Sequence, residues 1–350
     1  MTDPPVSVLM TTYNGAHSIA ASIASVLAQS FPDYELIVVD DGSTDTTPDI
    51  LAACRDPRLR IIRPPRNSGV VAARNLGFAA TRGGYVAMLD HDDLAHPDRL
   101  ARQVAYLDRH PRVVLLATEI ELEINGRRRA PDHPHGGDPL LLRWLLHVDN
   151  PLTWSSVMLR ADAVRRLNVF LRADFELADD FDLYHRLLAV GDIARLDQPL
   201  TVYRWHAHNT TFGNEARQDA GAVNVLRAAY AHWLGGDAEI AARLVVRHLA
   251  DREPVCDAAT LDRLAVYIER LLDGFCTDCC GTPAERQRIR AVGGDIWWRT
   301  VRASVRTGAP GLLGQYRRHA ALAGAFRPSP VDLAASLAIG ALRSGRRAAK

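Results

Sequence analysis

The feature that most constrains the fold is a repeated alternation of short apolar segments with helical patterns near the start of the sequence. Strand-like segments lie at 6–10, 35–39, 60–62 and 85–89. Helical patterns lie at 19–27, around Ile50 and Leu51, at 69–80 and after Pro97. Segment 35–39 is almost wholly apolar, as expected for a strand covered on both faces. Strands that alternate with helices form right-handed βαβ units, so the sequence predicts an α/β fold with a mostly parallel sheet.

Strand signals fade in the last third of the chain and helical signals replace them. Segments 113–117 and 119–124 have strand character, and 127–139 has the composition of a loop. Amphipathic Ala/Leu/Arg-rich patterns then follow at 223–234, 238–250 and 259–273. We therefore expect an α/β domain at 1–214 and a mainly helical C-terminal region with a basic tail at 215–350.

Charge and cysteine content exclude some classes of protein. The 350 residues include 42 Lys and Arg against 41 Asp and Glu, so no global charge points to a nucleic-acid partner. Five cysteines without a regular spacing fit a reducing compartment. The N-terminus has no signal-peptide pattern, and apolar runs do not reach the ~18–20 residues that span a bilayer. These patterns predict a cytoplasmic protein.

Three of the expected strands end in polar clusters, which should meet at one edge of the sheet. The clusters are 11–14 (TTYN), 40–41 (DD) and 90–93 (DHDD). The pair Asp40 and Asp41 can cap the following helix, for which Ser43 or Thr44 is also suited. Two adjacent carboxylates after a buried strand also carry an electrostatic cost. That cost favours a partner such as a nucleobase N–H or a ribose hydroxyl, and both interpretations remain open.

Asp90 and Asp92 form a D-x-D pattern at the end of the fourth strand. In extended chain the two carboxylates lie on the same side and repel each other unless a cation lies between them. Hard oxygen ligands favour Mg²⁺ or Mn²⁺, which would neutralise a diphosphate leaving group. The alternative is a solvated acidic turn before the helix after Pro97. The position beside Asp40 and Asp41 favours the metal site.

A third acidic cluster, at 178–182 (ADDFD), begins a predicted helix. Acidic residues in a first turn stabilise the helix dipole, which is the structural explanation. A general base for an acceptor hydroxyl must also be a carboxylate or histidine within hydrogen-bond reach, and Asp179 or Asp180 can serve. His206 follows Arg204 after a strand-like segment. It could contact a diphosphate or complete a metal shell, or it could have a structural role.

Together these patterns resemble the family 2 glycosyltransferases, inverting enzymes with the GT-A fold. The resemblance covers about residues 5–212 and rests on six motifs in order. They are 6–14 (VSVLMTTYN), 38–45 (VVDDGSTD), 67–69 (NSG) with 73–75 (ARN) and Gly77, 88–93 (MLDHDD), 178–183 (ADDFDL) and 203–206 (YRWH). The motif at 178–183 departs from the common Glu-Asp pair of the family, because Asp179 replaces the glutamate.

The resemblance implies a role for each matching residue. Thr11 and Tyr13 would hold the nucleobase, Asp41 with Asp40 the base or ribose, and Arg74 the nucleotide. Asp90 and Asp92 would form the D-x-D, with Asp92 the direct ligand of Mn²⁺ or Mg²⁺ and His206 at the metal or diphosphate. Asp180, beside Asp179, would be the catalytic base. The expected partners are a nucleotide-sugar donor, with UDP- or dTDP-sugars favoured, and a saccharide or lipid-linked acceptor in surface polysaccharide or glycolipid assembly.

Two rival functions use similar residues. A nucleotidyltransferase also needs paired acids and a metal, but usually has a Gly-rich basic loop after its first strand, which 11–15 lack. A catalytically silent nucleotide-sugar-binding scaffold would be marked by loss of the D-x-D or of Asp180, and both are present.

Two further signals lie in the C-terminal region. Cys276, Cys279 and Cys280 suggest zinc, but a structural site needs a second ligand pair, which is missing. The apolar segment 331–342 is followed by Arg343, Arg346, Arg347 and Lys350. Such a segment either lies on the inner face of an anionic membrane, docks on its own domain, or contacts a second subunit in a homo-oligomer.

Overall fold

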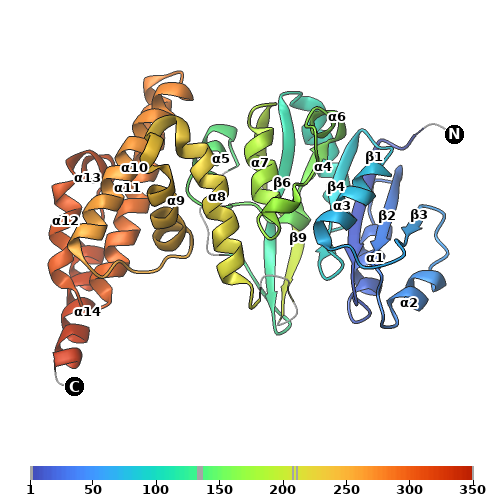
Figure 1. Ribbon diagram of the computed structural model, residues 1–350, viewed down its shortest axis with the longest axis horizontal. Helices are drawn as coiled ribbons and strands as arrows, with labels where there is room; N and C mark the ends of the chain where they lie inside the picture. The colour runs from blue at the N-terminus through green and yellow to red at the C-terminus, as the bar shows by residue number, and fades with distance from the viewer. Residues whose placement is uncertain (1–2, 132–136, 207–208, 210–211, 349–350) are drawn as a thin grey trace. The chain divides into compact units, whose positions relative to one another are not determined.

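A computed structural model describes residues 3–131, 137–206, 209 and 212–348, with side chains to Ser344. The chain forms two compact units (Figure 1). The first contains Met1–Arg143 and Pro151–Gly221, and the second contains Trp144–Asn150 and Ala222–Lys350. The chain therefore enters the second unit briefly, returns to the first, and enters the second again.

The first unit is built on one sheet, to which nine strands of the described residues belong. The strands are β1 (Val6–Thr12), β2 (Tyr34–Asp40), β3 (Leu59–Ile62), β4 (Tyr85–Met88), β5 (Leu94–Ala95), β6 (Val113–Ile124), β7 (Arg127–Arg129), β8 (Met158–Arg160) and β9 (Asp192–Trp205). Their order is β3-β2-β1-β4-β8-β6-β9-β5, with β7 beside β6. Strands β3, β2, β1 and β4 are parallel, as are β6 and β9, whereas β8, β7 and β5 pair antiparallel. The α/β class with a helical C-terminal region is confirmed.

Helices of the first unit connect and cover these strands (Figure 1). They are α1 (Ile19–Leu27), α2 (Thr47–Ala53), α3 (Val70–Ala79), α4 (Arg99–Arg109), α5 (Pro139–Leu145, which continues into the second unit), α6 (Ala161–Arg165), α7 (Asp179–Leu187) and the start of α8 (Glu215–Leu234), with short 3₁₀ turns at Trp154–Ser156 and Ala173–Phe175.

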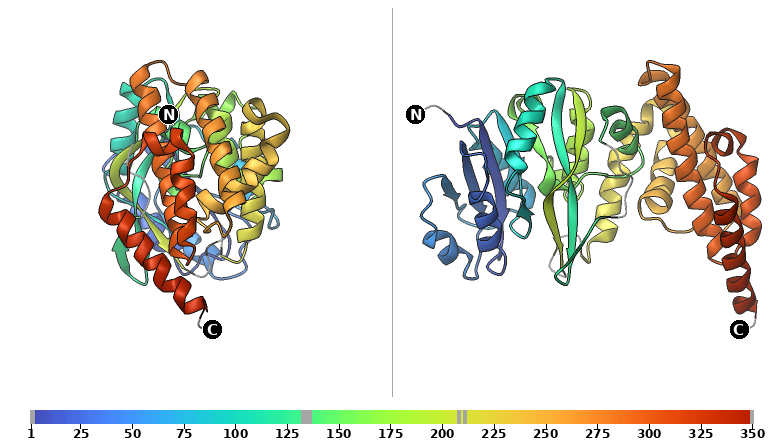
Figure 2. Two further views of the ribbon diagram at one scale, coloured as in Figure 1. Left: turned by 90° about the vertical axis from the view of Figure 1, so that its left-hand side faces the viewer. Right: turned by 180° about the vertical axis from the view of Figure 1, so that it is seen from behind.

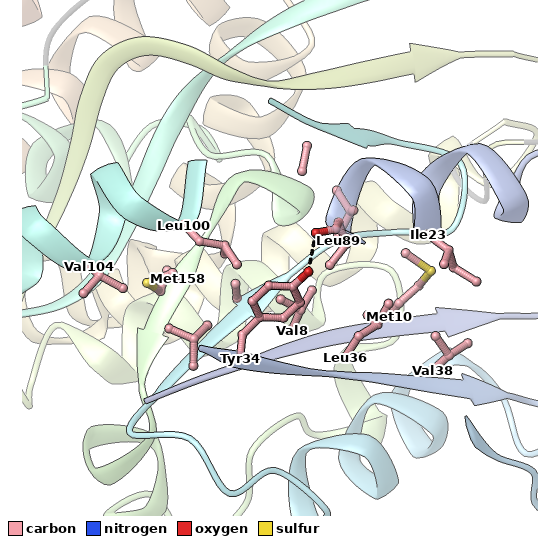
Figure 3. Packing of buried hydrophobic residues seen from close by; sticks show 14 of the residues in the cluster. Val8, Met10, Ile23, Tyr34, Leu36, Val38, Leu89, Leu100, Val104 and Met158 are labelled. Carbon is pink, nitrogen blue, oxygen red and sulfur yellow. Dashed lines mark hydrogen bonds between the residues drawn. The ribbon is translucent and has the colours of Figure 1, made fainter. Parts of the chain in front are cut away.

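One face of β1 and β2 packs against α1 and α4, as Figure 3 shows. Residues at alternate positions along β2, namely Tyr34, Leu36 and Val38, belong to this core. The buried Tyr34 hydroxyl donates a hydrogen bond to the carbonyl of Val26 at 2.8 Å, which satisfies the one polar atom of that side chain.

The opposite face of these strands is covered by α3, which approaches closely at Gly77. A Cβ atom at Gly77 would lie 2.3 Å from Leu9 Cδ1 and 3.0 Å from Val39 Cγ2. Because both faces are covered, β1 and β2 are buried over their whole length. This explains the apolar segments in the sequence and brings the N-terminus of α3 to the edge where β2 ends.

Three local predictions were wrong. Segments 113–117 and 119–124 form one strand, β6, because β6 pairs with β9 across register shifts at Thr118 and Glu119. Residues 127–129, predicted as loop, pair with β6 as β7. Neither Ser43 nor Thr44 caps the next helix, which begins after Thr46 without a side-chain cap.

The second unit is helical and holds the rest of α8, α9 (Ala238–Val245), a π-helical turn at Val246–Ala250, α10 (Ala258–Asp278), α11 (Pro283–Arg306), α12 (Leu313–Arg318), α13 (Ala320–Ala325) and α14 (Pro330–Ala348), with 3₁₀ turns at Gly235–Asp237 and Pro310–Leu312. Helices α10 and α11 lie side by side (Figure 2). Thr282 and Glu285 form a capping box at the start of α11. Every helix in the described part of the chain is too short or too polar to cross a lipid bilayer.

Candidate active site

The ends of β1, β2 and β4 meet at one edge of the sheet, as the sequence predicts. Thr12 is the register partner of Asp40, and Leu9 is the partner of Met88 two residues before Asp90. The loop after β1 also touches the segment after β4, because a Cβ atom at Gly15 would lie 2.4 Å from His91 Cδ2. All three predicted polar clusters therefore belong to one edge.

Asp40 and Asp41 are both buried, and each has partners inside the protein. Asp40 accepts a hydrogen bond from the Ser43 N–H at 3.0 Å and lies 3.3 Å from Nε of Arg63. Asp41 accepts hydrogen bonds from the N–H of Ser68 at 2.9 Å, its hydroxyl at 2.7 Å, and the N–H of Gly69 at 2.8 Å. Asp41 is therefore satisfied without a ligand and fixes the loop that leads into α3, whereas one oxygen of Asp40 has no hydrogen-bond partner within the described residues.

Thr11 is buried at the end of β1, and the exposed fraction of Tyr13 is 47%. Asn14 follows with a φ of 53°. Its side-chain oxygen accepts a hydrogen bond from the N–H of Thr44 at 2.8 Å, and its own N–H donates to the Ser43 hydroxyl. These bonds join the loops after β1 and β2 and leave the Tyr13 ring open to solvent.

Arg74 of α3 joins two of the predicted acidic clusters. Its guanidinium donates to Asp179 at 2.9 Å and to Asp90 at 3.1 Å, and lies 4.5 Å from the ring centre of Trp154. Burial opposes the charged form of Arg74, but the carboxylates of Asp90, Asp179 and Asp180 outweigh it and raise the pKa. Arg74 therefore carries a positive charge at the point where the acids converge.

The two acids that begin α7, Asp179 and Asp180, differ in how deeply they are buried. Asp179 is buried against Arg74, whereas Asp180 is half-buried and accepts a hydrogen bond from the Phe181 N–H at 2.7 Å. One turn further, the Tyr184 hydroxyl is buried and has no hydrogen-bond partner within the described residues. Burial and then the charge of Asp180 raise the pKa of Tyr184 well above its usual value, although Arg74 opposes this.

Asp92 lies against the segment that ends β9. Its carboxylate is 3.2 Å from Nε2 of His206 and 3.4 Å from the side-chain nitrogen of Asn209, and its carbonyl accepts a hydrogen bond from Arg204. The D-x-D is thus joined to His206, whose role at a metal or diphosphate stays a prediction. Residues 207–208 and 210–211 lie outside the described residues.

Asp93 is the most buried acid of the segment after β4. One carboxylate oxygen accepts the Arg204 N–H at 2.9 Å, and the other has no hydrogen-bond partner in the described part of the chain. Burial and then the charges of Asp92 and Asp90 raise the pKa of Asp93 well above its usual value. The carboxylates of Asp92 and Asp90 therefore disfavour a further negative charge on Asp93.

The described residues hold no group of three or more His, Cys, Asp and Glu side chains arranged as a complete metal site. His17 lies near the D-x-D, with its ring centre 6.4 Å from that of His91 and 5.7 Å from that of His206. In the second unit, Cys276 and Cys280 are buried free thiols, and burial followed by the nearby Cys276 raises the pKa of Cys280 to about 12.

Several residues that shape the site were not predicted. Trp154 lies beneath Arg74, and the Ser155 hydroxyl accepts the Asp90 N–H at 3.0 Å. Asn209 and Tyr184 were also missed. Trp154 and Ser155 lie on a short 3₁₀ turn before β8, and no periodic pattern or motif marks them in the sequence.

Comparison with known proteins identifies the class of protein to which this site belongs. Residues 7–167 match the family Glycosyl transferase family 2. The putative glycosyltransferase EpsE of Bacillus subtilis is 34% identical over 197 residues, which cover 54% of this chain and 68% of EpsE. The chain therefore belongs to glycosyl transferase family 2, and the resemblance seen in the sequence is confirmed.

Two further proteins are similar to parts or all of this chain. The succinoglycan biosynthesis protein ExoO of Rhizobium meliloti is 46% identical over 105 residues, which cover 30% of each chain. Crystal structures of residues 1–349 of S. aureus TarS, with UDP and with UDP-GlcNAc, share the fold at a TM-score of 0.53. The UDP complex is 19% identical and covers 100% of this chain and 92% of TarS 1–349.

Proposed function

We propose that this glycosyltransferase moves a sugar from a nucleoside diphosphate sugar to an acceptor hydroxyl, with inversion at the anomeric carbon. The observation that carries the proposal is the convergence of acids on Arg74. Asp90 follows the central strand β4, and Asp179 and Asp180 begin α7, yet all three charges act on this one guanidinium. A family 2 transferase needs acids for the donor and for the acceptor within one site.

The donor side of the proposal rests on the ends of β1 and β2. The exposed Tyr13 ring would stack on the nucleobase, and Thr11 would border it. Asp40 and Asp41 accept hydrogen bonds from neighbouring backbone N–H groups. They would therefore act mainly by holding the loop that faces the base or ribose. TarS, whose fold this chain shares, was solved with UDP, which supports UDP- or dTDP-linked donors.

A divalent ion, Mn²⁺ or Mg²⁺, fits the segment after β4. The available ligands are hard carboxylate oxygens, and the carboxylates of Asp90 and Asp92 lie close enough to raise the pKa of the buried Asp93, a repulsion that a cation would relieve. Asp92 and Asp90 would hold the ion together with phosphate oxygens of the donor, and His206 would border it. When bound, the ion neutralises charge on the diphosphate leaving group.

The acceptor side of the proposal rests on Asp180. Asp180 is less buried than Asp179, and we assign it to accept a proton from the acceptor hydroxyl. The acceptor oxygen would then form its bond to the anomeric carbon as the bond to the diphosphate breaks on the opposite face, which inverts that carbon. The similarity to ExoO, named for succinoglycan biosynthesis, supports a saccharide or lipid-linked acceptor in surface polysaccharide assembly.

A thermal-shift titration with UDP, dTDP and GDP, each with and without Mn²⁺, tests the donor site. A ligand that binds only the folded state raises its melting temperature. We expect a metal-dependent shift with UDP or dTDP in wild type and in Asp180→Asn, and none in Asp92→Ala. The exposed Asp33→Ala is the matched control.

Sugar transfer by the same variants separates binding from chemistry. Asp180→Asn should bind the donor yet lose turnover by ~10²–10⁴-fold, the usual contribution of a general base. A wild type that binds no nucleotide would contradict the donor site and favour a scaffold. Full activity of Asp180→Asn would exclude it as the base.

A further inference from the structure

Helix α14 in the second unit contacts the bundle through polar and small residues, beside the half-buried Leu333 and Ile339. The side that contacts the bundle carries Asp332, Ser336 and Gly340, spaced one turn apart. Gly340 is required there, because a Cβ atom would lie 2.5 Å from the carbonyl oxygen of Val305 in α11. An ordinary surface helix would turn its apolar side toward the bundle.

Polar contacts hold α14 on α11. Asp332 accepts hydrogen bonds from the Trp298 indole at 3.0 Å, from Arg302 at 3.3 Å and from Arg306 at 3.0 Å. Arg306 also donates to the Ser336 hydroxyl at 3.1 Å. These bonds fix which side of α14 faces outward.

The outward side of α14 is wholly apolar along the described residues 331–342. Its exposed side chains are Val331, Ala334, Ala335, Leu337, Ala338, Ala341 and Leu342. Exposed fractions reach 78% for Val331 and 70% for Leu342. Val331, Ala335, Ala338 and Leu342 follow helical spacing and so form one continuous stripe. An apolar stripe of this kind marks a binding surface.

Basic residues follow this stripe in the sequence. Arg343 is exposed, and its guanidinium also donates to the Arg306 carbonyl at 3.0 Å. The sequence adds Arg346, Arg347 and Lys350, whose side chains lie outside the described residues. The one acidic residue of α14, Asp332, is already engaged by α11.

We propose that the outward stripe of α14 binds the surface of an anionic lipid membrane. Apolar side chains would enter the boundary between headgroups and acyl chains, and the arginines would contact the anionic headgroups. Charge argues against a second copy of the chain on the stripe. Two α14 helices would each bring a basic cluster and offer no free carboxylate in return. Anionic lipid supplies the opposite charge.

Sedimentation of the full chain with lipid vesicles tests this proposal. The vesicles contain phosphatidylcholine alone or mixed with phosphatidylserine. We expect wild type to sediment with the anionic vesicles only, and less so at high salt. Val331→Ser with Leu342→Ser should weaken binding about tenfold. Replacing Arg343, Arg346 and Arg347 by Ser should weaken it about a hundredfold, since each basic residue near the surface contributes about 1 kcal/mol.

Controls separate lipid binding from misfolding and from self-association. Ile240→Ser removes an apolar side chain that is 46% exposed on α9, away from the stripe, so it should sediment like wild type. Circular dichroism should show unchanged helix content in each variant. The proposal would be overturned if wild type did not bind anionic vesicles. It would also be overturned if the double variant of Val331 and Leu342 bound them as strongly as wild type. A wild-type dimer that this variant converts to a monomer in light scattering would overturn it as well.

Discussion

At the residue scale, Arg74 is the side chain on which the site depends. It neutralises Asp179, whose side chain is 5% exposed, and it also binds Asp90 and packs on Trp154. Among the described residues, Arg74 is the one cation within salt-bridge distance of Asp179. Removing Arg74 would therefore leave an uncompensated buried charge, which is more costly than the loss of a surface ion pair.

We predict that Arg74→Ala lowers the free energy of unfolding by about 3 kcal/mol. Asp179→Asn in the same chain should recover part of this loss, because an amide needs no counter-charge. Chemical denaturation of both single variants and the double variant measures the coupling. Arg66→Ala, on an exposed loop, should change stability by less than ~0.5 kcal/mol. Equal losses in the single and double variants would contradict the argument.

The sequence predicted which acids converge but not how they are held. Asp90, Asp92 and Asp179 could be placed because each follows a strand or begins a helix, and those positions fix a direction in space. The contacts of Arg74 join α3, the end of β4 and α7, so they depend on side-chain packing between segments far apart in the chain. No local pattern encodes the position of Trp154 under that guanidinium.

At the scale of elements, Glu35 of β2 ties together the start of the parallel sheet. Its buried carboxylate accepts hydrogen bonds from Ser7 of β1 at 2.8 Å, Arg60 of β3 at 2.7 Å and Arg82 before β4 at 2.8 Å. Burial raises the pKa of Glu35, but the bonds from Arg82, Arg60 and Ser7 outweigh it and hold the pKa below its ordinary value. One ionised side chain therefore connects neighbouring strands.

This depressed pKa predicts a pH-dependent stability. A carboxylate with a lower pKa in the folded state stabilises the protein above its unfolded pKa of about 4.3, and that contribution is lost as the pH falls through the folded pKa. Glu35→Gln should thus lower the free energy of unfolding by about 2 kcal/mol at neutral pH. Denaturation at successively lower pH should show that the difference in free energy of unfolding between wild type and Glu35→Gln disappears below about pH 4. If this difference in free energy did not depend on pH, the shape of the Glu35 side chain rather than its charge would be what stabilises the fold.

Strand positions could be predicted where burial on both faces makes the sequence apolar, as in β1 and β2. The polar break at Thr118 suggested two strands, yet β9 pairs across it through a bulge. Strand β8 was missed because it is short and its partners β4 and β6 are distant in sequence. Pairing of this kind is decided by tertiary contacts rather than by local propensity.

At the scale of the whole molecule, the chain crosses between its units more than once. The segment Trp144–Asn150 belongs to the second unit. There the ring centre of Trp144 lies 5.3 Å from that of Phe275, and the His147 carbonyl accepts a hydrogen bond from the Tyr230 hydroxyl at 2.5 Å. Both partners come from the helices after residue 221.

We therefore predict that residues 1–221 alone are poorly stable, although they contain the whole first unit. Without the second unit, the buried side chains Trp144, Leu145 and Leu146 would lose their cover. The fragment should bind a hydrophobic dye and melt at a lower temperature than the full chain. Replacing Trp144 and Leu145 by Ser in the fragment should reduce dye binding. A fragment that melts like the full chain without binding dye would contradict this prediction.

The same crossing sets an order of events during synthesis. Trp144–Asn150 leaves the ribosome well before Tyr230 and Phe275, its partners in the second unit. At about 5–20 residues per second, the segment waits on the order of ten seconds for them. The nascent chain must therefore shield an apolar segment in its middle while the first unit folds around it. During this interval the nascent chain exposes the most apolar surface to which a chaperone can bind.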